Sequence, residues 1–323
     1  MSATPTDLPA DLDSSYRILR EGAGWWWRER DVVLAAGPDA SSYLQGQLSQ
    51  DLGSLAIGGS VPSLLLHPDG KVVAWLRVTR LADDRFALDV DAGAGEAVLA
   101  RLKRFLLRVK VELADPGAGA PMRCLSVRGP GAGTVEISAS ADAIVAAVSA
   151  RDLPGRDVLV ARDADAAVVG GAASAVDPVA YEAIRIEQGL PAMGAELNDK
   201  TIPGEAGAWL IDASVSFSKG CYTGQELVAR IDSRGNNVPR HLRGVVLTGR
   251  VGDPPPVGAE LVTGDKVVGS LTSVAWSPGF HHPIALGFVG RAVEPPAAVT
   301  VRWDGGEADA SVQELPLHPP TSS

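Results

Sequence analysis

Residues 219–226 bring together the side chains that could carry out chemistry. They read Lys-Gly-Cys-Tyr-Thr-Gly-Gln-Glu, and they place Cys221, one of two cysteines in the chain, on a glycine turn before an expected helix through Arg230. The amide groups at a helix start and the nearby Lys219 ammonium both favour a thiolate over a thiol. Cys221 is therefore a candidate catalytic or contact residue. A buried cysteine that only packs on a tight turn is the alternative that local chemistry leaves open.

The elements around this segment are predicted from hydrophobic periodicity. Residues 1–24 are short of aromatic and β-branched side chains, which predicts a flexible tail. Asp83 and Asp84 form an expected hairpin turn, and short alternating apolar runs from residue 242 onward indicate an all-β module. The other expected elements are strands at 61–66, 72–81 and 86–90 and helices at 38–50, 98–109 and 141–150.

Composition limits the possible classes of protein. A chain of 323 residues is long enough for two or three domains with their own cores. The net charge of −10 and the pI near 5.0 argue against stable binding to nucleic acid or to an anionic membrane. Two cysteines cannot supply the four thiolates of an ordinary iron–sulfur cluster, and we predict no metal site.

The expected location is the cytoplasm, and the expected state is a monomer. The N-terminal residues lack the basic start and the apolar run of a signal peptide. No stretch reaches the roughly 18 consecutive apolar residues that are needed to span a bilayer.

Residues 219–226 match the motif KGCYxGQE of the YgfZ-type folate-binding proteins, which are relatives of the aminomethyltransferase (T-protein) of the glycine cleavage system. Three further blocks resemble the wider superfamily and follow in the same order. They are residues 37–51, 185–205 and 268–289. The chain therefore resembles this family over most of its length.

The resemblance implies a fold and a division into domains. We expect an α+β protein with two ferredoxin-like subdomains and a C-terminal β-barrel, arranged as a ring around a central folate-binding hole. The expected boundaries are a tail at 1–24, a folate-binding portion at 25–238 with subdomains at about 25–115 and 120–238, a barrel at 239–316 and a tail at 317–323.

The resemblance also implies the ligand, tetrahydrofolate or a one-carbon derivative, and the residues that bind it. Glu187 lies at the position whose carboxylate is expected to accept two N–H bonds from the pterin. Lys219 suits a folate glutamate tail or the N5 region, and Tyr222 suits stacking, with core packing as its alternative. The expected cofactor-binding set is Glu187, Glu205, Lys219, Cys221, Tyr222 and Gln225.

One departure from the family bears on activity. The aminomethyltransferases carry a GGxxDD-like hairpin, and aligning its first glycine with Gly70 puts Ala74 and Trp75 at the two aspartates. Neither side chain can accept a proton. The alternative, in which Asp51 or Asp69 takes over, requires a different register.

Three functions remain open on this basis. The resemblance implies a tetrahydrofolate-binding protein that supports iron–sulfur cluster assembly or repair in client enzymes, and thereby tRNA thiomodification, with Cys221 contacting a partner protein. The alternative is a folate-dependent one-carbon transferase with a rearranged active site, so whether the chain is an enzyme stays open. A folate-binding module in which Cys221 has no role is the third.

Overall fold

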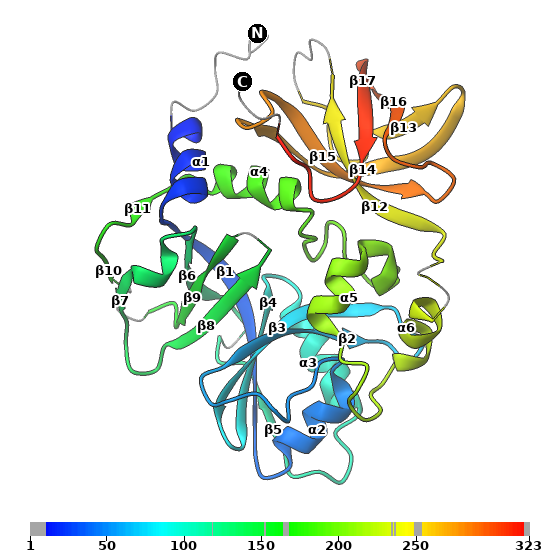
Figure 1. The fold of residues 1–323 in the computed structure, drawn as a ribbon. Helices are drawn as coiled ribbons and strands as arrows, with labels where there is room; N and C mark the ends of the chain where they lie inside the picture. Colours follow the sequence, from blue (N-terminus) through cyan, green and yellow to red (C-terminus); the bar gives the residue numbers. More distant parts are fainter. Residues whose placement is uncertain are drawn as a thin grey trace.

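The computed structural model describes residues 11–117, 119–151, 153–163, 168–233, 235, 237–248 and 254–319. A curled sheet with its helices forms one portion, and a closed β-barrel forms the other (Figure 1). Helix α4 (Pro178–Gln188) lies between the two portions and packs against strands of the barrel. The predicted α+β class with a C-terminal barrel is confirmed.

The main sheet contains nine strands, and seven follow the order β2-β3-β4-β1-β6-β9-β8, with β5 and β11 also paired to β1. A separate pair of strands, β7 and β10, flanks it. The bounds are β1 (Gly24–Ala36), β2 (Ser60–Leu66), β3 (Val72–Ala82), β4 (Arg85–Asp91), β5 (Glu112–Ala114), β6 (Met122–Arg128), β7 (Glu136–Ser138), β8 (Ile144–Ala150), β9 (Leu153–Val160), β10 (Val168–Gly170) and β11 (Ser174–Ala175).

Strand β1 belongs to both halves of this sheet. It is 13 residues long. Its first part pairs with β6 from Gly24 to Arg30, and its second part pairs with β4 from Arg30 to Ala36. Arg30 therefore lies opposite Asp91 on one side and Met122 on the other. The two predicted subdomains consequently share one continuous sheet.

Two helices cover the first half of the sheet. They are α2 (Ala40–Gln47), which lies inside the predicted range 38–50, and α3 (Gly95–Arg104), which begins three residues before the predicted range 98–109 and ends five residues before its end. Leu44, Val98 and Leu102 are fully buried in one core with the inner faces of β3 and β4. The turn at Asp83 and Asp84 between β3 and β4 is as predicted.

The N-terminal tail prediction is wrong for residues 12–21, which form helix α1 (Leu12–Glu21); residues 1–10 lie outside the described part of the chain. Leu12 and Leu19 are buried with Trp26 and Ile184, so α1 packs on α4 and on the start of β1. Two leucines two turns apart make a helical face that composition alone does not reveal.

The helix predicted at 141–150 is also wrong, because strand β8 occupies 144–150. Its register places Ile144 opposite Leu159 and Val148 opposite Gly155 of β9. Ile144 and Ala146 are buried while Val145 is exposed, which is the two-residue period of a strand. The high helix propensity of alanine is a weak preference that pairing in the sheet overrides.

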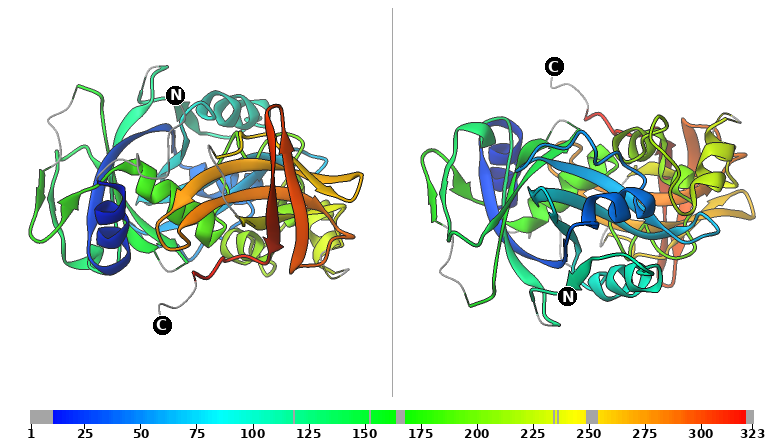
Figure 2. Two further views of the ribbon diagram at one scale, coloured as in Figure 1. Left: turned by 90° about the horizontal axis from the view of Figure 1, so that it is seen from above. Right: turned by 90° about the horizontal axis from the view of Figure 1, so that it is seen from below.

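The C-terminal portion is a closed barrel with the strand order β12-β15-β14-β13-β16-β17. Its strands are β12 (Arg240–Leu247), β13 (Glu260–Thr263), β14 (Lys266–Ser277), β15 (His282–Gly290), β16 (Ala297–Trp303) and β17 (Gly306–Gln313). Seen from above, the barrel and α1 lie side by side over the sheet portion (Figure 2). The all-β module predicted from residue 242 is confirmed.

Short helices connect the sheet portion to the barrel. They are η3 (Pro203–Ala206), α5 (Ala208–Ser214) and α6 (Gln225–Asp232), whereas η2 (Ala132–Thr134) lies between β6 and β7. Helix α6 begins inside residues 219–226, as the glycine turn predicted. Within the described residues, no helix has the length and apolar character that a membrane crossing requires.

Candidate functional site

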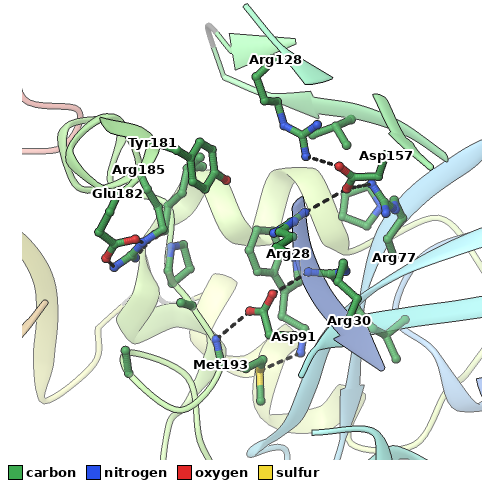
Figure 3. A pocket seen from close by; sticks show the side chains of 18 of the residues that line it. Arg28, Arg30, Arg77, Asp91, Arg128, Asp157, Tyr181, Glu182, Arg185 and Met193 are labelled. Atoms are coloured by element: carbon green, nitrogen blue, oxygen red, sulfur yellow. Dashed lines mark hydrogen bonds and ion pairs between the residues drawn. The ribbon is translucent and has the colours of Figure 1, made fainter. Parts of the chain in front are cut away.

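A cavity of about 430 Å³ lies between the main sheet, helix α4 and residues 190–195 (Figure 3). Eight strands contribute to its lining, including β14 of the barrel through Ser273. Trp75 and Trp209 form an aromatic corner, with their rings 5.9 Å apart in an edge-to-face arrangement. The charged residues that line it are Arg28, Arg30, Arg77, Asp91, Arg128, Asp157, Glu182 and Arg185.

Asp157 is the centre of the charged face of the sheet. Its fully buried carboxylate accepts hydrogen bonds from Arg28 Nη2 at 2.9 Å, Arg77 Nη1 at 2.8 Å, Arg128 Nη2 at 2.8 Å and Ser126 Oγ at 2.7 Å. Burial acts to raise the pKa of Asp157, but Arg128, Arg28 and Arg77 hold this pKa well below its ordinary value. The carboxylate is therefore anionic throughout the neutral range.

The ion pairs continue from Arg77 to the edge of the cavity. Asp89 accepts from Arg77 Nε at 2.9 Å and from Arg30 Nε at 2.5 Å. Arg30 Nη1 donates to Asp91 at 2.5 Å, and Asp91 also accepts the Met193 N–H at 3.1 Å. Burial acts to raise the pKa of Asp91, but Arg30 and Arg28 lower it below its ordinary value. We call the connected set the floor network, which comprises Arg28, Arg30, Arg77, Asp89, Asp91, Arg128 and Asp157.

The two-residue period of the strands puts these side chains on one face. Arg28 and Arg30 are two residues apart on β1, and Asp89 and Asp91 are two apart on β4. Val90, between the aspartates, faces the opposite side and is buried in the apolar core. The floor network was not predicted from the sequence. Charged pairs spaced by two inside apolar strands are the signal that could have found it.

Helix α4 forms the opposite wall. Asp177 caps its start by accepting the Val179 N–H at 2.9 Å, and Gly189 ends it with a φ of 67°. Arg185 donates to Glu182 through Nε at 2.8 Å and Nη2 at 2.5 Å, and its Nη1 donates to Glu196 at 3.2 Å. The bidentate pair of Arg185 and Glu182 fixes the polar side chains of the wall that faces the cavity.

The two positions aligned with the family aspartates lie on different faces of β3. Trp75 lines the cavity, and its indole N–H donates to Ser214 Oγ at 2.9 Å. Ala74 is fully buried in the core on the other side. Neither Asp51 nor Asp69 is among the residues that line the cavity. Its carboxylates are instead Asp91, Asp157 and Glu182, each paired with arginine.

Glu187 lies on the side of α4 that faces away from the cavity. It is fully buried and accepts hydrogen bonds from Ser277 Oγ, from Tyr16 at 2.9 Å and from the Arg20 guanidinium. Burial and the nearby carboxylate raise the pKa of Tyr16 to about 12, so its phenol stays a donor. In this structure Glu187 joins α4 to α1 and to the barrel.

Lys219 anchors the segment 219–226 to the end of helix α2. Its ammonium Nζ donates to the carbonyl oxygens of Gln45 at 2.7 Å, Leu48 at 2.7 Å and Gln50 at 3.0 Å. Burial lowers the pKa of Lys219 to about 8. Three carbonyls use all three N–H donors of an ammonium group, so the segment is held against α2.

The remaining predicted residues have separate positions. Tyr222 is buried in the core beneath α5 and α6, and its N–H donates to Gln225 Oε1 at 3.1 Å. Glu205 pairs with Arg240 of the barrel at 3.1 Å. Cys221 is exposed. The structure thus groups Lys219, Cys221, Tyr222 and Gln225 in one loop and places Glu187 and Glu205 elsewhere; none of the six lines the described cavity.

Metal binding by side chains finds no support in the described part of the chain. It contains no group of three or more His, Cys, Asp or Glu residues that could hold an ion. The second cysteine, Cys124, is buried, and burial raises its pKa. The aromatic corner and the charged lining suit the cavity to an organic ligand with flat and polar parts.

Comparisons with known proteins relate this architecture to others. Residues 240–318 match the glycine cleavage T-protein C-terminal barrel domain. An aminomethyltransferase of Thermus thermophilus is 29% identical over 310 residues, covering 88% of this chain and 84% of the relative. The tRNA-modifying protein YgfZ of Klebsiella pneumoniae is 31% identical over 224 residues, covering 64% of this chain and 66% of the relative.

A solved structure agrees with the sequence matches. The glycine cleavage system aminomethyltransferase T from Bartonella henselae superposes with a TM-score of 0.76 at 23% identity, covering 95% of this chain and 90% of that protein. At this identity the likeness concerns the fold. The barrel model, the sequence relatives and the fold all show similarity to proteins of the aminomethyltransferase superfamily.

Proposed function

We propose that this chain binds tetrahydrofolate or a one-carbon derivative in the central cavity and supports iron–sulfur cluster assembly or repair in client enzymes. The observation that carries the proposal is a cavity of about 430 Å³ in which Trp75 takes the position of a family aspartate. The volume is within the range of small-molecule sites, which is about 300–1,000 Å³.

The lining has groups that fit the parts of a folate. Trp75, Trp209 and Tyr181 offer aromatic surface to a pterin or a benzoyl ring. Asp91 accepts one hydrogen bond on each oxygen, from Arg30 and from the Met193 N–H, which leaves further lone pairs for ligand N–H groups. Asp91 is thus suited to the role that the sequence analysis assigned to Glu187.

The cavity is less suited to acid–base catalysis. An efficient general base has a pKa near the working pH. The pKa values of Asp91 and Asp157 are lowered by arginines, and Glu182 is held by a bidentate Arg185. A site of this kind favours binding of the ligand over proton transfer from it.

The segment 219–226 supplies the proposed contact with other proteins. Cys221 is exposed in the loop four residues before α6, and Lys219 holds this loop against α2. A link to tRNA thiomodification, through iron–sulfur client enzymes, is supported by the similarity to proteins named for tRNA modification.

A one-carbon transferase with a rearranged active site is the second candidate. It is favoured by the wider coverage of the aminomethyltransferase match, 88% of the chain against 64% for the YgfZ match. Asp91 is the carboxylate that such an enzyme would use, because it lines the cavity and its side chain is about one-third exposed. Formation of methylenetetrahydrofolate from tetrahydrofolate and an amine donor, lost in Asp91→Asn, would support this candidate.

Calorimetric titration of the full chain with tetrahydrofolate tests the ligand. We expect saturable one-to-one binding that Trp75→Ala weakens at least tenfold, about 1.4 kcal/mol. Phe217→Ala is the control, since Phe217 is an exposed aromatic outside the cavity. Absence of binding by the folded wild type would refute the folate proposal.

Activity of an iron–sulfur enzyme in cells that lack this protein tests the client role. Wild type is expected to restore the activity and Cys221→Ser to restore it only in part, while both bind tetrahydrofolate equally. Full rescue by Cys221→Ser would leave a folate-binding module without a role for the thiol.

A further inference from the structure

The floor network contains more cations than anions. Its arginines are Arg28, Arg30, Arg77 and Arg128, and its aspartates are Asp89, Asp91 and Asp157. Ion pairs connect all seven side chains. The network therefore carries one positive charge that no carboxylate within it balances. An unbalanced charge in a partly desolvated cavity attracts a ligand of opposite sign more strongly than it would in water.

The unbalanced charge can be traced to Arg28. Its Nε donates to Ser126 Oγ at 2.8 Å and its Nη2 donates to Asp157 at 2.9 Å, but its Nη1 has no hydrogen-bond partner among the described residues. The side chain is 25% exposed and lines the cavity. Figure 3 shows Arg28 near the middle of the lining, between Asp157 and Asp91.

The other three arginines of the floor network have fewer N–H donors that a ligand in the cavity could reach. Arg30 and Arg77 each use all three guanidinium nitrogens within the network. Arg128 has no described partner at Nε, but its side chain is only 2% exposed, and its Nη1 donates to two backbone carbonyls. Arg28 thus combines a free pair of N–H donors with access to the cavity.

The opposite wall has the reverse imbalance. Arg185 is paired with two carboxylates, Glu182 and Glu196, of which Glu196 lies behind the lining. Glu196 is saturated by Thr272, Ser273 and the Ala192 N–H. The excess positive charge is therefore local to the sheet side and does not extend over the whole cavity.

We propose that Arg28 is the anion-binding residue of the cavity and that a carboxylate of the bound ligand pairs with its Nη1. A guanidinium nitrogen with two free N–H groups is a strong donor to a carboxylate. The proposal rests on the proposed function in taking the carboxylate from the glutamyl end of a folate. A small carboxylic acid bound beside a folate would present the same group, so the test separates these two sources.

The test titrates the full chain with four probes. Tetrahydrofolate carries the pterin, the benzoyl ring and the carboxylates, 6-methyltetrahydropterin carries the pterin alone, p-aminobenzoylglutamate carries the benzoyl ring and the carboxylates without the pterin, and acetate represents a small acid. The variants are Arg28→Gln, which removes the charge, and Arg28→Lys, which keeps it. Arg123→Gln is the control, because Arg123 stacks on Trp27 and does not line the cavity.

If the folate carboxylate binds at Arg28, Arg28→Gln weakens the binding of tetrahydrofolate and of p-aminobenzoylglutamate about tenfold. The binding of 6-methyltetrahydropterin is expected to stay unchanged. Arg28→Lys is expected to restore part of this loss. If a separate acid binds there, acetate binding in the presence of tetrahydrofolate disappears in Arg28→Gln while tetrahydrofolate affinity is unchanged. Either pattern supports the anion site and identifies the source of the carboxylate.

Equal binding of all four probes to wild type and to a folded Arg28→Gln would overturn the anion site while leaving folate binding intact. If wild type fails to bind tetrahydrofolate, the proposed function fails, and the p-aminobenzoylglutamate and acetate titrations still decide on Arg28. If neither Arg28→Lys nor Arg28→Gln binds any of the four probes while both keep the wild-type melting temperature, Arg28 shapes the cavity. This outcome would also overturn the proposal.

Discussion

The central cavity and the segment 219–226 differ in how they are built. The segment is continuous in sequence, and its own residues hold it, as when Gln225 Oε1 accepts the Tyr222 N–H. The floor network comes from five strands, and Asp157 lies far along the chain from Arg28. The comparison teaches that a recognisable motif and a ligand cavity can be separate parts of one protein. The motif orders a loop, whereas the cavity depends on the sheet.

Asp157→Asn is expected to have the largest effect on stability, because it removes the carboxylate on which three arginines converge. Breaking a buried ion pair by removing one partner costs about 3–5 kcal/mol. Urea unfolding followed by tryptophan fluorescence measures this loss. A loss below about 1 kcal/mol would show that the network does not hold the floor together.

The same substitution has a pH signature. The folded pKa of Asp157 is lowered below its value in the unfolded chain, near 3.9, so its contribution to stability is complete above that pH and is lost as the pH falls toward the folded pKa. The difference in unfolding free energy between wild type and Asp157→Asn should therefore shrink below about pH 4. A difference that stays constant from pH 7 to pH 3 would contradict this origin.

Glu187→Gln is expected to have the second-largest effect on stability. The change leaves the shape but removes the buried charge that Arg20 and Tyr16 contact, and hydrogen bonds to charged groups contribute about 1.5–3 kcal/mol. We expect a loss of about 2 kcal/mol with tetrahydrofolate affinity changed less than tenfold. A tenfold loss of tetrahydrofolate affinity without a change in stability would instead indicate that Glu187 contacts the ligand.

Lys219→Met separates anchoring of the loop from binding of the ligand. Removing the three bonds to the carbonyls of Gln45, Leu48 and Gln50 should cost about 1–2 kcal/mol and increase the rate at which iodoacetamide alkylates Cys221. Lys71→Met is the matched control, since that lysine is exposed and pairs with Asp69. Faster folate release or weaker folate binding without faster alkylation would argue for a ligand role.

Cys221→Ser is expected to have the smallest effect on the fold. An exposed side chain away from the core changes stability by less than about 0.5 kcal/mol. Thermal unfolding and tetrahydrofolate titration should both match wild type. A clear stabilisation or destabilisation would indicate that the thiol packs inside the protein in solution.

The sequence was sufficient where neighbouring residues decide the structure. The turn at Asp83 and Asp84, the start of α6 and the strands of the barrel all follow from local patterns, and the structure contains them. Strand β8 was missed because pairing with β9, a nonlocal interaction, overrides alanine propensity.

The candidate site was predicted less well, for a geometric reason. Tyr181, Glu182 and Arg185 share the face of α4 that lines the cavity. Glu187 follows Arg185 by two residues, which on a helix turns its side chain through about 200° to the opposite face. Helical periodicity alone therefore predicts that Glu187 lies on a different face from Arg185. The floor network could not be assembled from sequence because it requires the order of the strands.

Strand β1 has a mechanical consequence for how ligands enter. Its pairings with β6 and with β4 overlap only at Arg30, so the backbone hydrogen bonds do not by themselves prevent bending at that residue. The ion pair between Arg77 of β3 and Asp157 of β9 spans this point and ties the two halves of the charged face together. Movement of α4 or of residues 190–195 would widen the cavity without breaking this ion pair.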